Sequence, residues 1–169
     1  MRGKWAEGIV PRNFAWVIKD RLAVCERPGG YGENHRRVRR QEEIIWIRQQ
    51  GFDRVISLIP APHNLHNYEE LEVAYLHRPF GPAEAEHEFL PAFYGELQAL
   101  LTAGERLIVH GEEVGDRLSG LLGGYLVWTG MVPHGPQAIS IVERIVTRQM
   151  GPRGRGLVAL AADLRPAAT

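Results

Sequence analysis

The segment that most constrains the fold of this chain covers residues 107–120 and reads LIVHGEEVGDRLSG. It has the pattern of an apolar strand, a short loop that ends at Arg117, and a helix that continues as LLGGYLVW. In a strand–loop–helix unit, the N–H groups of the loop converge and the helix dipole favours negative charge. We therefore expect an anion-binding cradle between this strand and this helix.

Strand-like and helix-like segments alternate along the rest of the chain. Residues 55–59 (VISLI) form a β-branched run typical of a parallel strand covered on both faces, and residues 72–79 (EVAYLHRP) form another strand. Residues 39–50 predict a helix that ends at Gly51. The alternation predicts an α/β fold, with a central, mostly parallel sheet, helices on both faces and a ligand crevice at the carboxyl ends of the strands.

The order of these segments resembles that of the cysteine-dependent dual-specificity and protein tyrosine phosphatases. The signature of that superfamily reads Val-His-Cys, five residues, Arg, and then Ser or Thr. The matching positions here hold His110, Gly111, Arg117 and, one place late, Ser119. The opening run PRNFAWV also resembles the start of the family domain. The resemblance covers about residues 11–160 and implies the phosphatase fold, but in a degenerate member without the nucleophilic cysteine.

Two catalytic groups that the resemblance implies are missing. In the family, a thiolate attacks phosphorus and an Asp on a separate loop protonates the leaving oxygen. Gly111 has no side chain, and the position of the acid falls near Gly81, which leaves Glu84 or Glu86 as a substitute or as the first turn of a helix. The single cysteine, Cys25, lies in an apolar strand-like run and is expected to be a buried hydrophobe.

The loop before Arg117 provides candidate ligand-binding residues, but its charge opposes phosphate. These residues are Glu112, Glu113, Val114, Gly115 and Asp116. A carboxylate about 6 Å from a phosphate charge costs roughly 3 kcal/mol at an effective dielectric of about 20.

Three interpretations of these acids are open. They form a solvated turn with Asp116 near the helix N-cap, or one carboxylate folds into the cradle in place of phosphate, or they bind a metal with His110. No HxxxH or CxxC pattern supports a metal, so we expect neither metal nor cofactor.

The length and composition of the chain restrict its class. The 169 residues predict one phosphatase-like domain at 11–162, with an extension at 1–10 and a tail at 163–169. The formal net charge of zero gives no indication of nucleic acid or membrane as a partner. One cysteine, no long apolar run and no signal-peptide core favour a cytoplasmic location, and the scarcity of lysine among the basic residues suggests a bacterial source.

Four further motifs have a structural interpretation beside a functional one. HRRVRR at 35–40 is expected to be an exposed helix start balanced by Glu33, Glu42 and Glu43, although an acidic partner or nucleic acid is the alternative. His63 and His66 are expected on a loop surface. GPRGRG at 151–156 is expected to be a turn between the last two helices, with an anion cradle as the alternative. The glycines of GLLGGYL are expected to pack closely against the neighbouring sheet; they are Gly120, Gly123 and Gly124.

The functional hypothesis is a catalytically inactive, phosphatase-like domain with a binding or regulatory role. Its partner is a protein or a phosphorylated ligand bound through Arg117 and the loop amides. The alternative is a hydrolase in which Glu112, Glu113, Asp116 or His110 activates water directly or through a metal, or a phosphatase with residual activity. The oligomeric state does not follow from the sequence.

Overall fold

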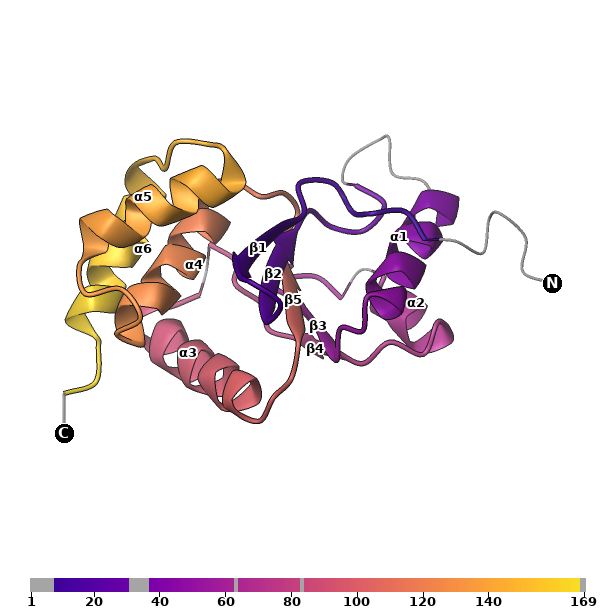
Figure 1. Ribbon diagram of the computed structural model, residues 1–169, viewed down its shortest axis with the longest axis horizontal. Helices are drawn as coiled ribbons and strands as arrows, with labels where there is room; N and C mark the ends of the chain where they lie inside the picture. Colours follow the sequence, from indigo (N-terminus) through magenta and orange to yellow (C-terminus); the bar gives the residue numbers. More distant parts are fainter. Residues whose placement is uncertain (1–7, 31–36, 63, 83, 168–169) are drawn as a thin grey trace. The chain divides into compact units, whose positions relative to one another are not determined.

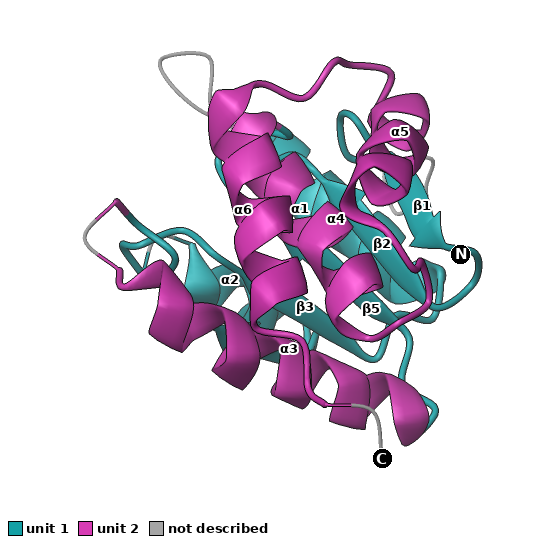
Figure 2. Ribbon diagram, turned by 90° about the vertical axis from the view of Figure 1, so that its left-hand side faces the viewer, with its two compact units in different colours: residues 1–81, 104–114 teal, residues 82–103, 115–169 magenta. Residues whose placement is uncertain are grey.

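A computed structural model describes residues 8–30, 37–62, 64–82 and 84–167. The chain divides into two compact units (Figure 2). The first unit comprises residues 1–81 and 104–114, and the second comprises residues 82–103 and 115–169. The predicted domain boundaries at 11–162 stay a prediction, and residues 1–7 of the expected extension and 168–169 of the tail lie outside the described residues.

The first unit is built on a five-stranded sheet in the order β1-β2-β5-β3-β4 (Figure 1). The strands are β1 (Ala15–Ile18), β2 (Leu22–Cys25), β3 (Arg54–Ser57), β4 (Tyr75–His77) and β5 (Leu107–His110). Only the β1–β2 pair is antiparallel within this sheet. The mixed α/β class and the mostly parallel sheet are therefore confirmed. The central position of β5 explains why its LIVH sequence is buried throughout.

Two helices of the first unit cover part of this sheet, α1 (Arg37–Gln49) and α2 (Leu65–Glu70). Their apolar residues Ile44, Ile47 and Tyr68 pack with strand residues in one buried cluster. Cys25 belongs to that cluster and is fully buried as a free thiol, as predicted.

One expectation about this unit is wrong and a second holds only in part. His66 is exposed on α2 rather than on a loop, because a six-residue helix is too short to show a clear apolar period. His63 lies outside the described residues.

The basic motif is also not simply an exposed helix start. Arg40 is 8% exposed, and burial lowers the pKa of its guanidinium. Glu43 is 1% exposed and lies 3.7 Å from Arg39, measured from Oε2 to Nε. Residues 35 and 36 and Glu33 lie outside the described residues. This helix therefore turns some of its charged residues inward, which a charge count cannot show.

The described residues of the second unit form four helices, α3 (Glu86–Thr102), α4 (Asp116–Trp128), α5 (Gly135–Val146) and α6 (Pro152–Asp163). Helix α4 is buried from residue 118 onward and packs mainly on α6 and α5. A Cβ on Gly120 would collide with the backbone of Gly154, and one on Gly124 would collide with Tyr94 Oη. Close packing at these glycines is thus confirmed. The prediction that they pack against a sheet is wrong, because their neighbours in this unit lie on helices.

Residues 151–156 were expected to form a turn, and this is wrong for most of the motif. Gly151 is the N-cap of α6, Pro152 is its first residue, and the remaining four residues continue the helix. Proline is favoured at the first helical position because its missing N–H is not needed there. The start of this helix was not predicted because glycine is unfavourable within a helix and GPRGRG contains three glycines.

Candidate functional site

The loop from the sequence analysis joins β5 to α4, so its residues are divided between the two units. Residues 110–114 belong to the first unit and residues 115–119 to the second. Each part makes its own contacts and is described separately.

His110, the last residue of β5, is 2% exposed and is held at both ring nitrogens. Its Nδ1 lies 3.1 Å from the carbonyl oxygen of Gly111, and its Nε2 lies 3.1 Å from the hydroxyl of Tyr68. A carbonyl can only accept, so Nδ1 carries the proton and Nε2 accepts from Tyr68. Burial lowers the pKa of His110 to about 4. The ring is therefore neutral at pH 7, and its one lone pair is already engaged.

Neither of the reactive groups beside this histidine supplies a nucleophile. Cys25 pairs with His110 in the parallel β2–β5 ladder. Burial, together with the charges of Glu43 and Glu26, raises the pKa of the Cys25 thiol well above its usual value. Burial also raises the pKa of Tyr68. Both groups stay protonated at neutral pH, and a thiol attacks only as its thiolate.

Glu112 is neutralised by a residue that the sequence analysis missed. Arg27 Nη1 lies 3.1 Å from Glu112 Oε2. The two residues follow β2 and β5 at equal distance from the paired residues Cys25 and His110, so the parallel ladder brings them together. The sequence shows an arginine two residues after a strand. Only the order of the strands in the sheet shows that this strand lies beside β5, and therefore that Arg27 can reach Glu112.

The other loop residues of this unit differ in exposure. Gly111, at the position that the resemblance assigns to the nucleophile, is half-buried, Glu113 is exposed, and Val114 is 8% exposed. Gly81, at the position that the resemblance assigns to the acid, is buried, and a Cβ there would lie 2.8 Å from Pro60 Cγ. A side chain at residue 81 therefore requires the ring of Pro60 to move.

Asp116, the first residue of α4, stabilises the start of another helix. Its carboxylate accepts hydrogen bonds from the N–H groups of Gly151, at 2.6 Å, and Gly154, at 3.0 Å. Gly151 is the N-cap of α6 and Gly154 its third residue, and N–H groups at these positions lack partners within the helix. The position next to the N-cap of α4 is as predicted, but Asp116 is not part of a solvated turn. Glu112 and Asp116 thus have partners of their own, while the expected repulsion between the loop carboxylates and a phosphate stays a prediction.

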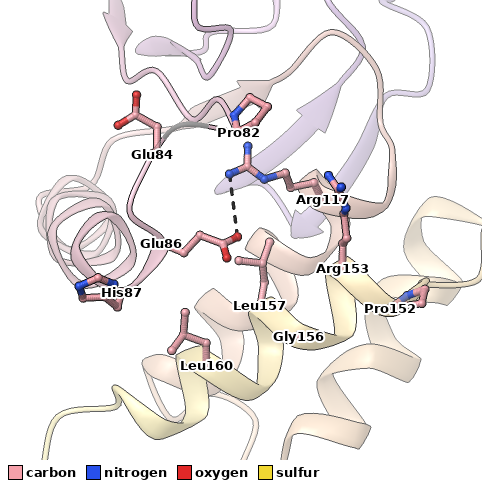
Figure 3. Close-up of a pocket in the computed structure, with 10 residues that line it drawn as sticks. All are labelled: Pro82, Glu84, Glu86, His87, Arg117, Pro152, Arg153, Gly156, Leu157 and Leu160. Atoms are coloured by element: carbon pink, nitrogen blue, oxygen red, sulfur yellow. Dashed lines mark ion pairs between the residues drawn. The ribbon is translucent and has the colours of Figure 1, made fainter.

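Arg117 faces acidic residues of the segment before and at the start of α3. Its Nη2 lies 3.9 Å from Glu86 Oε2, a distance for an ion pair rather than a hydrogen bond (Figure 3). Burial lowers the pKa of Arg117, while the charges of Glu86 and Glu84 raise it. Glu86 lies in the first turn of α3, as the structural interpretation predicted, whereas Glu84 precedes the N-cap of that helix. Ser119 is 3% exposed, and its Oγ has no hydrogen-bond partner among the described residues.

These acidic residues and Arg117 line a cavity of about 650 Å³ in the second unit (Figure 3). Its polar residues are Glu84, Glu86, His87, Arg117 and Arg153, and its other residues are Pro82, Pro152, Gly156, Leu157 and Leu160. The structure thus brings Glu84, Glu86 and Arg117 together. His87 and the two leucines were missed, because only the packing of α6 identifies them. Within the described part of the chain, no three His, Cys, Asp or Glu side chains are grouped to hold a metal ion. Among the same residues, no helix is both long enough and apolar enough to span a membrane.

Comparison with known proteins finds similarity in structure only. No sequence family matches the chain, and no characterised protein is significantly similar in sequence. A kinase-associated phosphatase with its catalytic-site cysteine replaced by serine has a TM-score of 0.75 at 15% identity, covering 94% of this chain and 99% of that one.

Two further structures give the same picture. Tk-PTP in its active form has a TM-score of 0.70 at 16% identity, covering 89% of this chain and 97% of that one. A human tyrosine phosphatase-like serine/threonine/tyrosine-interacting protein has a TM-score of 0.61 at 15% identity, covering 89% and 93%.

Proposed function

Starting from the fold that this chain shares with the dual-specificity and protein tyrosine phosphatases, we propose that it is a catalytically inactive domain with a binding or regulatory role. The observation that carries the proposal is the glycine at residue 111, in the position of the attacking thiolate. A backbone methylene cannot form a phosphoenzyme intermediate.

The surroundings of Gly111 support the proposal because neither Cys25 nor His110 can act as a replacement nucleophile. The Cys25 thiol is fully buried and protonated, and the lone pair of His110 accepts from Tyr68. Residue 81, the position expected for the general acid, has no room for a side chain, since Gly81 packs against Pro60. Nucleophile and general acid are lost together.

The charges near Arg117 support a weak affinity for phosphate. Glu86 and Glu84 oppose any dianion at this guanidinium. Arginine binds phosphate best through two parallel N–H···O hydrogen bonds. In this structure one of the guanidinium nitrogens, Nη2 of Arg117, faces the carboxylate of Glu86. We therefore expect a phosphorylated ligand to bind less well than in an active phosphatase, and a protein partner is equally compatible with the proposal. One protein of the same fold is itself named phosphatase-like and interacting.

The alternative, a hydrolase that activates water with a carboxylate, has one observation in its favour. Glu84, Glu86 and His87 line the same cavity as Arg117. Glu86 forms an ion pair with Arg117, so its carboxylate already has a cationic partner. We therefore place this alternative second.

Hydrolysis of p-nitrophenyl phosphate tests the proposal. We expect the purified protein and a Gly111→Ala, Arg117→Ala double variant to have the same rate, both at the level of buffer. A rate clearly above that of the double variant contradicts the proposal. Measuring with and without a chelator distinguishes the metal-dependent alternative, since only that activity is lost on chelation.

A further inference from the structure

The cavity of the second unit has a cationic part. Arg117 and Arg153 both line it and lie close enough for the charge of Arg153 to lower the pKa of Arg117 (Figure 3). Arg153 is exposed and makes no hydrogen bond or ion pair with the described residues, whereas Arg155 of the same helix bonds to Glu143 and Met150. A free guanidinium at the wall of a cavity is suited to bind a planar anion.

The floor of the cavity is apolar and open. Leu157 and Leu160 lie along α6 beneath the charged residues (Figure 3). Gly156 lies beside them, and a Cβ there would meet nothing within 4 Å. By contrast, a Cβ at Gly154 would lie 2.6 Å from Met150 Cγ. Packing therefore requires the glycine at 154 but not at 156, where the missing side chain leaves space in the cavity.

The cavity offers one guanidinium without a partner among the described residues. Two arginines, Arg117 and Arg153, and two glutamates, Glu84 and Glu86, line it. Glu86 forms an ion pair with Arg117, so Arg153 is the arginine left to bind an anion, and one guanidinium matches the shape and charge of one carboxylate. The first-turn N–H groups of Gly151 and Gly154 are already bonded to Asp116, so they add nothing to anion binding here.

From these observations we propose that the cavity binds a small amphipathic monocarboxylate. Its carboxylate lies at Arg153 and Arg117, and its aliphatic chain lies over Leu157 and Leu160. The volume of about 650 Å³ is in the range of small-molecule sites. The inference rests on the proposed function only in that it assumes a cavity free for binding rather than phosphoryl transfer.

A titration with sodium hexanoate tests the inference, followed by the amide NMR shifts of residues 151–160. We expect saturable shifts with a millimolar dissociation constant, weaker shifts with acetate, which lacks the chain, and with 1-hexanol, which lacks the charge. Inorganic phosphate is expected to bind this site more weakly than hexanoate does.

Two variants with matched controls locate the binding. Arg153→Gln should weaken hexanoate binding about 10-fold, as expected for a charge-assisted contact, whereas Arg144→Gln on α5 removes the same charge elsewhere and should leave it unchanged. Gly156→Leu should fill the cavity and abolish saturable binding. Gly95→Leu on α3 is its control, because a Cβ at Gly95 also meets nothing within 4 Å.

Each result supports or overturns the inference. Absence of saturable hexanoate shifts, unchanged binding in Gly156→Leu, or tighter binding of phosphate than of hexanoate overturns it. Thermal unfolding of Gly156→Leu and Gly95→Leu verifies that both variants are folded. Turnover of p-nitrophenyl phosphate contradicts the proposed function alone, because the titration reports on the cavity whether or not the protein is catalytic.

Discussion

The two ends of the loop between β5 and α4 satisfy their polar groups in different ways. His110 is 2% exposed and held by contacts of 3.1 Å at both ring nitrogens, whereas Arg117 keeps a quarter of its side chain exposed and faces Glu86 at 3.9 Å. Burial makes His110 neutral and ties its ring to the fold of the first unit. The guanidinium of Arg117 is charged and lines a cavity. The residue at one end of the loop thus has a structural role, whereas the residue at the other end lines a cavity.

The largest expected effect is a difference in the free energy of unfolding between a variant at His110 and a variant at Arg117. Replacing His110 with Ala removes a buried ring and leaves the Tyr68 hydroxyl without its acceptor, so we expect a loss of about 3 kcal/mol in the free energy of unfolding. Arg117→Ala should cost less than about 1 kcal/mol because its ion pair is partly exposed. Urea denaturation measures both. Equal losses would remove the distinction between the two ends.

The pH dependence of stability sharpens the same distinction. The pKa of His110 is about 4 when folded and about 6.5 when unfolded, so the unfolded state binds more protons between these values. Burial of the neutral ring therefore costs no stability above pH 6.5, and the free energy of unfolding decreases as the pH falls from 6.5 toward 4. Between pH 7 and pH 5 we expect a loss of about 2 kcal/mol, which is absent in His110→Gln. Denaturation of both proteins at the two pH values provides the test, and equal losses exclude His110 as the cause.

Asp116 provides a smaller effect in the second unit. Asp116→Ala removes the acceptor for two N–H groups at the start of α6, and we expect a loss of about 1 to 2 kcal/mol in the free energy of unfolding. Asp116→Asn keeps one amide oxygen as an acceptor and should lose less. The exposed Glu113→Ala is the control, with an expected change within about 0.5 kcal/mol. If Asp116→Ala has the stability of Glu113→Ala, the carboxylate does not stabilise α6.

The smallest expected effect is on activity. Gly111→Cys alone should not give substantial hydrolysis of p-nitrophenyl phosphate, because the acid position at Gly81 remains without a carboxylate and Arg117 still faces Glu86. Adding Gly81→Asp should destabilise the protein, since the new Cβ meets Pro60. Substantial turnover by Gly111→Cys would show that the missing thiol is the main defect.

Several elements were predictable because their signals are local. The apolar run LIVH, the glycine after α1 and the acidic first turn of α3 all depend on residues close in sequence. Helix α2 and the start of α6 were not predicted, since one is short and the other is rich in glycine and proline. The fold class was predicted from the order of these strand and helix patterns along the chain. A change of one residue does not remove such a pattern.

The sequence by itself determined which side chains are absent: residue 111 carries none, and one cysteine lies far from it along the chain. Only the tertiary structure decided which partner each remaining charge has. Arg27 meets Glu112 because β2 and β5 are parallel neighbours, and Asp116 meets α6 because that helix packs on α4. Electrostatic energy depends on distances and burial that a linear sequence does not contain, so a run of acidic letters could not show which of these carboxylates has an ion-pair or hydrogen-bond partner.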